Sequence, residues 1–442
     1  MIERETRAQT AYVIHPQSTD SQTWRAEARL EEAEGLAIAL DLEPILTRIE
    51  PLRKIDPGQF FGSGKLDALH QQIKSDQADV LIIDASVTPV QQRNLERALK
   101  VKVIDRTGLI LEIFARRAQT REGRLQVELA RLTYERSRLV RTWTHLERQR
   151  GGHGFMGGPG ETQIETDRRI LADKMSKLRR ELDSVRRTRE LHRKRRAQAP
   201  WPVVALVGYT NAGKSSVFNV LSDAKVLAKD MPFATLDPTT RAVKTPNGRN
   251  ILLSDTVGFI TDLPTELIAA FRATLEEVVN ADVLIHVRDM SDPDHDGRKA
   301  DVEAVLEALG VRDDSDQVLI EAWNKSDRLE QEAYDDLVWQ ARMAKSPDAI
   351  ITSAIKGQGL DTLLSRVDEA LSRQDEDIVL TLPPQAAHAL AWLHQNGQIL
   401  YSSIDQKSGE TKLQVRLSGA DLGRFRQKFP ELDHPAQAQT VQ

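Results

Sequence analysis

Short apolar runs alternate with longer helix-like stretches along most of this 442-residue chain. The runs have the length of buried strands and lie at residues 11–14, 80–83, 101–104, 203–207, 251–253, 318–320 and 349–351. In the stretches between them, apolar residues recur at three- and four-residue steps, as at residues 24–40, 64–74, 264–280 and 298–309. This alternation predicts an α/β fold with mostly parallel sheets covered by helices.

The pattern changes in the middle of the chain, at residues 115–196. Two helix-like stretches each carry a narrow apolar seam, formed by Leu125, Leu129, Leu132, Leu139, Trp143 and Leu146 and then by Ile164, Leu171, Met175, Leu178, Leu182 and Val185. The segment 151–160 between them is rich in glycine and has to end both helices. We therefore expect an antiparallel helical hairpin with a flexible, glycine-rich tip.

The last part of the chain has a mixed pattern. A strand-like run at residues 378–382 precedes a helix over 384–395, two strands flank residues 407–410, and a helix covers 419–429. These elements predict a small α+β domain. The polar residues after it predict a disordered tail.

A phosphate-binding motif follows the apolar run at residues 203–207. The chain continues as Gly208, Tyr209, Thr210, Asn211, Ala212, Gly213, Lys214 and Ser215, a full match to Gly-x4-Gly-Lys-Ser. A glycine-rich turn between a strand and a helix lets backbone N–H groups converge on phosphates. Lys214 is suited to pair with the β and γ phosphates, and Ser215 to bind Mg²⁺, so the motif predicts a nucleoside triphosphate site.

Three further motifs narrow the nucleotide to GTP. Residues 255–258 (Asp-Thr-Val-Gly) offer a carboxylate for the metal and a glycine N–H for the γ-phosphate. Residues 324–327 (Asn-Lys-Ser-Asp) read the base, because Asp327 can accept from the N1–H and 2-amino groups of guanine, which adenine lacks. Residues 353–355 (Ser-Ala-Ile) follow another strand-like run, where a backbone N–H for guanine O6 is expected.

The net charge of −5 conceals a basic middle region. Residues 115–196 hold 23 Lys and Arg against 11 Asp and Glu, so the rest of the chain is strongly acidic. One interpretation is a dimeric coiled coil with a solvated basic face. The other, which we favour, is insertion of the tip into folded RNA, where cations pair with phosphates and an aromatic side chain stacks on a base. The candidate RNA-binding residues are Arg148, Arg150, His153, Phe155, Arg168 and Arg169.

Other features exclude some classes of protein and site. The chain has no cysteine, which excludes disulfides and cysteine-bound metals, and it shows no signal peptide or apolar membrane span. We expect a cytoplasmic protein, with peripheral membrane association left open. Gly62–Lys65 lacks the Ser or Thr of a phosphate loop and is interpreted as a helix start. Asp84 and Asp105 end apolar runs and are interpreted as caps.

The chain resembles the GTPase HflX family, in the translation-factor-related class that includes Obg-like proteins. The resemblance rests on Phe60–Lys65, on Asp105–Leu111 with Arg116–Ala118, on Gly158–Gln163 with Glu165–Arg169, and on Phe233–Asp237. It implies an N-terminal α/β domain (1–114), a basic helical hairpin (115–196), a P-loop GTPase domain (200–373), a small C-terminal α+β domain (374–430) and a disordered tail (431–442).

The family resemblance also implies a function. HflX-like proteins hydrolyse GTP, bind the large (50S) ribosomal subunit, split stalled or stressed 70S ribosomes and place the glycine tip near the peptidyl-transferase centre of the 23S rRNA. We expect the same of this chain, as a monomer, with residues 151–160 as the tip. In the family pattern, Thr235 joins Ser215 as an Mg²⁺ ligand. The expected GTP-binding residues are Gly208, Tyr209, Thr210, Asn211, Ala212, Gly213, Lys214, Ser215, Phe233, Ala234, Thr235, Leu236, Asp237, Asp255, Thr256, Val257, Gly258, Asn324, Lys325, Ser326, Asp327, Ser353, Ala354 and Ile355.

The catalytic residue is unknown. Phe259 stands after Gly258, where Ras-like proteins carry the glutamine that orients the attacking water, so intrinsic hydrolysis should be slow and should depend on a ribosomal partner. Asn211 resembles an asparagine that holds K⁺ in some related GTPases. Two other functions remain open: a GTP-controlled factor for RNA or tRNA modification or remodelling, and a signalling switch that binds proteins only.

Overall fold

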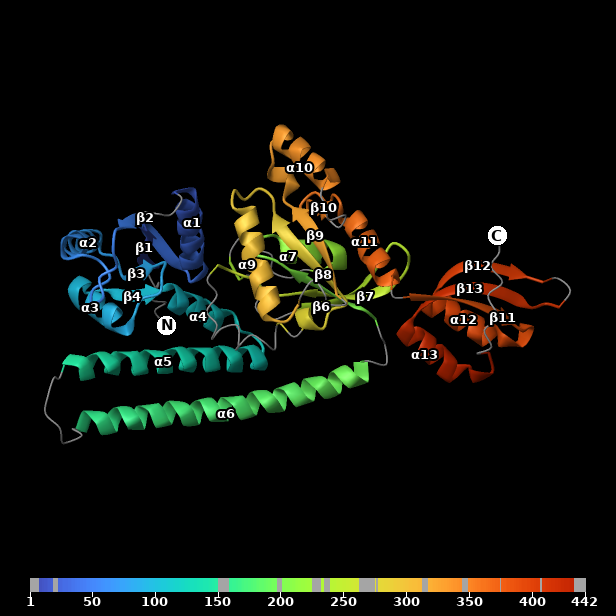
Figure 1. Cartoon of the computed structure of the whole chain (residues 1–442), viewed down its shortest axis with the longest axis horizontal. Coiled ribbons are helices and arrows are strands. Elements are labelled where there is room, and N and C mark those ends of the chain that lie inside the picture. Colours follow the sequence, from blue (N-terminus) through green and yellow to red (C-terminus); the bar gives the residue numbers. More distant parts are fainter. Residues whose placement is uncertain are drawn as a thin grey trace, which may run out of the picture.

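The computed structural model of the chain comprises three sheets and a long pair of helices (Figure 1). It describes residues 8–18, 23–149, 159–196, 201–224, 232–233, 239–261, 275, 277–311, 317–343, 349–373, 375–405 and 408–432. The segments follow one another in space much as they do in sequence. The N-terminal sheet, the central sheet and the C-terminal sheet lie in a row, and the helical pair runs beneath the first two (Figure 1).

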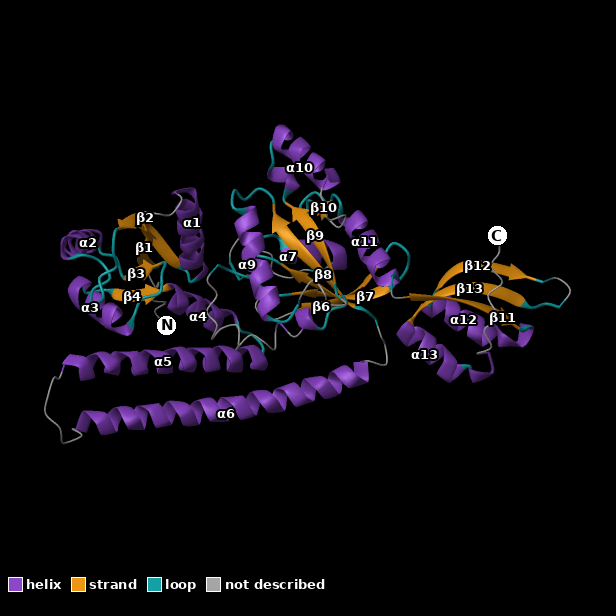
Figure 2. Ribbon diagram, viewed as in Figure 1, coloured by secondary structure: helices purple, strands orange, loops and turns teal. Residues whose placement is uncertain are grey.

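The N-terminal part is a four-stranded parallel sheet with the order β2-β1-β3-β4. Its helices cover the two faces, as Figure 2 shows in purple around the orange strands. The elements are β1 (Gln9–Ser18), α1 (Thr23–Ala39), β2 (Leu42–Leu52), α2 (Ser63–Asp76), β3 (Val80–Ile83), α3 (Pro89–Leu99), β4 (Lys102–Asp105) and α4 (Arg106–Arg117). The expected α/β character of this part is confirmed.

Local sequence sets several of these boundaries. Thr88 caps the start of α3 with a capping box. Its side chain accepts from the Gln91 N–H, and the Gln91 side chain accepts from the Thr88 N–H. Helix α2 begins after Gly62, so the helix-start interpretation of Gly62–Lys65 holds. Asp105 caps α4 by accepting from the Gly108 N–H, as expected. Asp84 is different, because its buried carboxylate pairs with Arg106 and His15 instead of capping a helix.

The middle region is the predicted antiparallel hairpin. Helix α5 (Arg121–Gln149) and helix α6 (Pro159–Arg196) lie side by side and run in opposite directions (Figure 1). Met175 and Leu182, from the predicted seam, are buried on α6. Midway along α5, the Tyr134 hydroxyl donates to the Asp105 carboxylate at 2.6 Å and so ties this helix to the end of β4. The first helix of the hairpin therefore packs alongside α3 and α4 of the N-terminal part.

The central sheet has six strands with the order β10-β9-β8-β5-β7-β6, of which β6 runs antiparallel to β7 and the other pairs are parallel. Its elements are β5 (Val203–Val207), α7 (Lys214–Ser222), β6 (Thr239–Lys244), β7 (Asn250–Asp255), β8 (Val283–Asp289), α9 (His295–Ala308), β9 (Val318–Asn324), a 3-10 turn (Ser326–Arg328), α10 (Gln331–Met343), β10 (Ala349–Ile351) and α11 (Leu360–Ser372). The expected helix over 264–280 lies largely outside the described residues.

The C-terminal part is a three-stranded antiparallel sheet with the order β11-β13-β12 and helices on one face. It consists of β11 (Asp375–Leu382), α12 (Ala387–Asn396), β12 (Gln398–Ile404), β13 (Thr411–Ser418) and α13 (Gly419–Lys428), with 3-10 turns at Pro384–Ala386 and Pro430–Leu432. Leu413, Val415 and Phe425 form its buried centre. The predicted small α+β domain agrees with these elements.

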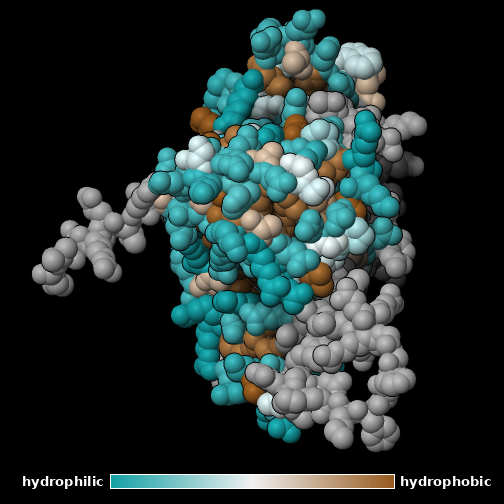
Figure 3. All heavy atoms as spheres, turned by 90° about the vertical axis from the view of Figure 1, so that its left-hand side faces the viewer, coloured by the Kyte–Doolittle hydropathy of each residue, from teal (hydrophilic) through white to brown (hydrophobic). Residues whose placement is uncertain are grey.

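One hydrophobic core is shared by the N-terminal and central sheets. It contains Val13 and Phe114 from the first and Val207 and Phe259 from the second. The surface at the N-terminal end is mostly hydrophilic, with apolar side chains in separate patches (Figure 3). Among the residues described, none of the helices combines the length and the apolar content that crossing a membrane requires.

Candidate functional site

The phosphate-binding motif forms a turn between β5 and α7. Gly208 has φ of +148°, and a Cβ there would lie 2.3 Å from the Val287 carbonyl oxygen. Gly213 has φ of +97°, and a Cβ there would lie 2.3 Å from Nδ2 of Asn324. Both glycines are therefore required by backbone conformation and by close packing, which explains their place in the motif. The α7 N-terminus follows directly and presents its N–H groups to the turn.

Lys214 is buried beneath this turn. Its ammonium group donates to the carbonyl oxygens of Gly208 at 3.0 Å and Tyr209 at 2.7 Å. Burial lowers the pKa of Lys214 to about 8; the nearby Asp255 carboxylate opposes this shift and Lys325 adds to it. A cation at this depth is stabilised strongly by phosphate oxygens, because they replace the water that burial removes.

Ser215 and Asp255 form an oxygen pair beside the turn. The Ser215 hydroxyl donates to the Asp255 carboxylate at 2.7 Å, and Asp255 is fully buried at the end of β7. A hydroxyl and a carboxylate are hard oxygen donors of the kind that Mg²⁺ prefers when nucleotide phosphates complete its shell. The residues present therefore fit a magnesium ion held by Ser215, with Asp255 in reach through water.

The Asp-x-x-Gly loop, residues 255–261, lies directly against the phosphate-binding turn. The Thr210 N–H donates to the Phe259 carbonyl at 2.7 Å, and the Phe259 N–H donates to the Gly208 carbonyl at 3.1 Å. A Cβ on Gly258 would lie 2.9 Å from Cγ2 of Thr210 and 3.0 Å from Nζ of Lys214. The Phe259 side chain is buried in the shared core. It supplies no group that could orient a water molecule.

The base-reading motifs meet beside the same turn. The Asn324 side chain donates to the Ala212 carbonyl at 2.9 Å and accepts from the Ala354 N–H at 3.1 Å. The Ser353 hydroxyl donates to the Asp327 carboxylate at 2.5 Å. Segments that are far apart in sequence thus converge on one edge of the sheet, at the carboxyl ends of β5, β9 and β10, where ligands bind in doubly wound folds.

Some predicted site residues lie outside the described residues or at their border. Ala234, Thr235, Leu236 and Asp237 are outside, as are Arg150, His153 and Phe155. Phe233 is described and has φ of +55°, which is rare for an aromatic residue. Its ring is buried in a T-shaped contact with Phe114, with centroids 4.6 Å apart. Arg148 lies on α5, and Arg168 and Arg169 are exposed on α6.

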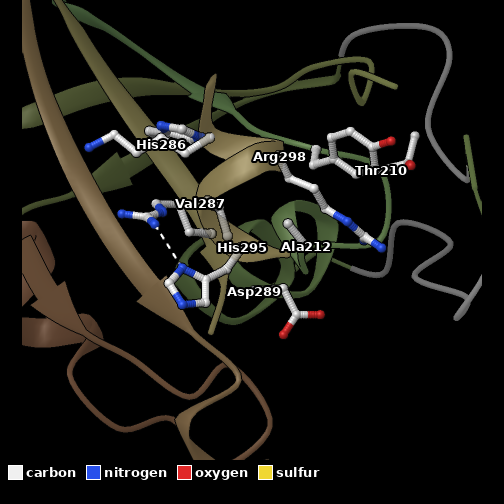
Figure 4. A pocket seen from close by; sticks show the side chains of 10 residues that line it. Thr210, Ala212, His286, Val287, Asp289, His295 and Arg298 are labelled. Carbon is white, nitrogen blue, oxygen red and sulfur yellow. Dashed lines mark hydrogen bonds between the residues drawn. The ribbon is translucent and has the colours of Figure 1, made fainter. Parts of the chain in front are cut away.

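Strand β8 supplies polar residues that the sequence analysis missed, because they interrupt an otherwise apolar run. His286 and Arg288 line a small pocket together with Tyr209, His295 and Arg298 (Figure 4). Burial lowers the pKa of His286, so its imidazole is neutral. Glu321 accepts from Arg288 at 2.8 Å and from Lys299 at 2.6 Å. Burial would raise the pKa of Glu321, but these hydrogen bonds outweigh burial and lower it. Because Lys299 lies on α9 and Glu321 on β9, the same hydrogen bonds hold α9 to the sheet.

Four protein-family models match successive parts of the chain. They are described as GTP-binding GTPase N-terminal (residues 27–115), GTP-binding GTPase Middle Region (117–196), 50S ribosome-binding GTPase (203–325) and HflX C-terminal domain (338–439). Together they span the N-terminal sheet, the helical hairpin, the phosphate-binding sheet and the C-terminal sheet.

Similar proteins cover nearly the whole chain. It is 48% identical to the GTPase HflX of Magnetococcus marinus over 90% of this chain and 89% of that protein. It is 39% identical to the GTPase HflX of Escherichia coli over 98% of this chain and 99% of that protein. A solved structure described as SsGBP in complex with GDP is 28% identical over 83% of this chain and 99% of that one, with a TM-score of 0.48.

Proposed function

Because the chain belongs to the GTPase HflX family and hydrolyses GTP, we propose that its GTP form binds the 50S subunit and dissociates stalled or stressed 70S ribosomes. In this proposal, GTP and Mg²⁺ occupy the site between the phosphate-binding turn, the Asp-x-x-Gly loop and the base-reading motifs. Ser215 and Thr235 hold the metal, which neutralises phosphate charge. The protein then alternates between a GTP form that binds the ribosome and a GDP form that leaves it.

The basic surface of α6 is the observation that carries the ribosome proposal. Its apolar residues Met175 and Leu182 are buried. Its exposed cations are Arg168, Arg169, Lys174, Lys177, Arg179, Arg180 and Arg187. Within the described part of the chain, none of these seven forms an ion pair. Solvated cations along a helix favour phosphate binding, because RNA releases its own counterions when they attach.

Co-sedimentation with purified 50S subunits tests this proposal. We expect more protein to pellet with a non-hydrolysable GTP analogue than with GDP, and 50S subunits to accelerate GTP hydrolysis. Replacement of Arg168 and Arg169 by alanine should weaken pelleting and reduce its dependence on salt concentration. A matched control replaces the exposed Arg93 and Arg97 on α3, which changes the net charge equally. Equal pelleting with both nucleotides would contradict the switch, and a footprint on free tRNA would favour RNA modification.

Potassium belongs to the same proposal through Asn211. This residue is exposed in the phosphate-binding turn with φ of +62°, and its side-chain carbonyl is a suitable oxygen ligand for an alkali cation near the phosphates. We expect hydrolysis to be faster in KCl than in NaCl at equal ionic strength, and Asn211→Ala to abolish that difference. Identical rates in both salts would exclude a role for K⁺.

A further inference from the structure

The side chain of Tyr209 leaves the phosphate-binding turn and reaches the N-terminal sheet. Its hydroxyl donates to the carboxylate of Glu32, on α1, and accepts from the Thr261 N–H at 2.9 Å. Tyr209 is 5% exposed and the Glu32 side chain 7% exposed. A hydrogen bond to a desolvated carboxylate is stronger than one between neutral groups, so the Tyr209 hydroxyl joins the backbone at Thr261 to α1.

Arg106 makes a second connection at the same place. Its guanidinium donates to Glu32 at 2.6 Å and to Asp84 at 2.5 Å, and also to the Thr261 carbonyl at 3.0 Å. Thr261 is three residues after Gly258 in the Asp-x-x-Gly loop. One buried arginine therefore joins two carboxylates of the N-terminal sheet to the backbone of the loop expected to contact the γ-phosphate.

The position of Arg106 in the fold adds to its significance. It follows β4 directly, and Asp84 follows β3, so both lie at the carboxyl edge of the parallel sheet. That edge is where doubly wound folds bind their ligands. In this chain, Arg106 at the carboxyl edge of the N-terminal sheet binds the Asp-x-x-Gly loop of the central sheet.

A third contact reaches the segment that contains Thr235. Phe114 on α4 packs edge-on against Phe233, and Gly35 on α1 leaves room for Pro232, whose ring carbons would lie 3.5 Å from a Cβ at that position. The N-terminal sheet thus touches the phosphate-binding turn, the Asp-x-x-Gly loop and the start of the Phe-Ala-Thr-Leu-Asp segment. These are the three parts of the proposed site that surround the phosphates.

We infer that Glu32 and Arg106 are positioning residues of the GTP site, which hold the Asp-x-x-Gly loop where Gly258 can meet the γ-phosphate and so favour GTP over GDP. They touch no nucleotide themselves and act through Tyr209 and Thr261. Preorganisation of the loop lowers the entropic cost of binding the third phosphate, whereas the α and β phosphates are held by the turn and α7 alone. This inference rests on the proposed nucleotide site and is independent of ribosome binding.

Tyr209→Phe and Glu32→Gln test the inference, because both nearly preserve shape and leave the Arg106 to Asp84 pair intact. Calorimetry with Mg²⁺ would give affinities for GDP and for a non-hydrolysable GTP analogue. We expect each variant to bind the analogue about tenfold more weakly, with GDP affinity within about twofold of wild type. The double variant should lose less than the sum of the two single losses, because both changes remove the hydrogen bond between Tyr209 and Glu32.

Tyr134→Phe is the matched control. It also removes a hydroxyl that donates to a buried carboxylate, that of Asp105, but midway along α5 of the hairpin. Both its nucleotide affinities should equal those of wild type. A purely structural role for Tyr209 and Glu32 would lower the affinities for both nucleotides together, and that result, or unchanged analogue binding, would overturn the inference. Failure of wild type to bind either nucleotide would instead refute the nucleotide site itself.

Discussion

Thr210 and Phe259 are joined by a 2.7 Å hydrogen bond between the Thr210 N–H and the Phe259 carbonyl. This bond links the phosphate-binding turn to the Asp-x-x-Gly loop without an intervening side chain. A displacement of either segment therefore acts on the other directly. Gly258 lies where the two segments meet. Because it has no side chain, the segments can pack closely at this point.

Gly258→Ala should damage this junction. The added Cβ would lie 2.9 Å from Cγ2 of Thr210 and 3.0 Å from Nζ of Lys214, distances that require the loop to move. We expect the rate of GTP hydrolysis to fall at least about tenfold, since a misplaced reacting group is costly. Single-turnover hydrolysis measures the rate, and thermal unfolding serves as the folding control. A wild-type rate would show that the loop leaves this position before the reaction.

Asp327→Asn should change which base is bound. The amide NH2 of asparagine can donate to the 2-carbonyl of xanthine, whereas its single carbonyl oxygen cannot accept from both the N1–H and the 2-amino group of guanine. We expect GDP affinity to fall about 100-fold and xanthosine diphosphate to bind better than GDP. Competition binding with the two nucleotides checks this. Asp336→Asn on α10 makes the same chemical change at an exposed position and should leave GDP affinity unaltered.

Nucleotide binding should take up a proton at alkaline pH. Burial lowers the pKa of Lys214 to about 8 in the free protein, and bound phosphates should raise it. Below pH 8 the ammonium is already present, so affinity should be nearly independent of pH. Above pH 8 affinity should fall, by up to about tenfold per unit. Calorimetry in two buffers of different ionisation enthalpy measures the uptake directly. Its absence at pH 8.5 would contradict the assignment.

Arg249 should hold the C-terminal sheet to the central one. It donates to Asp368 on α11 at 3.0 Å and to Asp375 at the start of β11, and both carboxylates are almost fully buried. Removing one partner of a buried pair leaves charge uncompensated, which typically costs about 3 kcal/mol. We expect Arg249→Gln to expose β11 to hydrogen exchange while GTP hydrolysis remains normal. Unchanged exchange in β11 would show that other contacts suffice.

Sequence patterns predicted those features that depend on neighbouring residues. The α/β character, the hairpin, the cap at Asp105 and the strand-to-helix phosphate turn are confirmed, because periodicity, caps and glycine spacing act over a few residues. Asp84 was wrongly interpreted as a cap, since its partner Arg106 becomes a neighbour only when β3 and β4 pair. Contacts such as Arg106 to Thr261 were missed for the same reason. The metal-binding role of Thr235 stays a prediction.

The path of the chain around the hairpin has a consequence for how the two sheets meet. Helix α5 starts from the N-terminal sheet, and α6 ends at Arg196, shortly before β5 begins at Val203. The covalent chain through the hairpin and the contact from Arg106 to Thr261 together close a ring. A partner that separates Arg106 from Thr261 leaves the two sheets connected by the hairpin, so each stays at high effective concentration near the other. Re-closure is then an intramolecular event that depends on tether geometry, so it needs little intrinsic affinity and is independent of protein concentration in the cell.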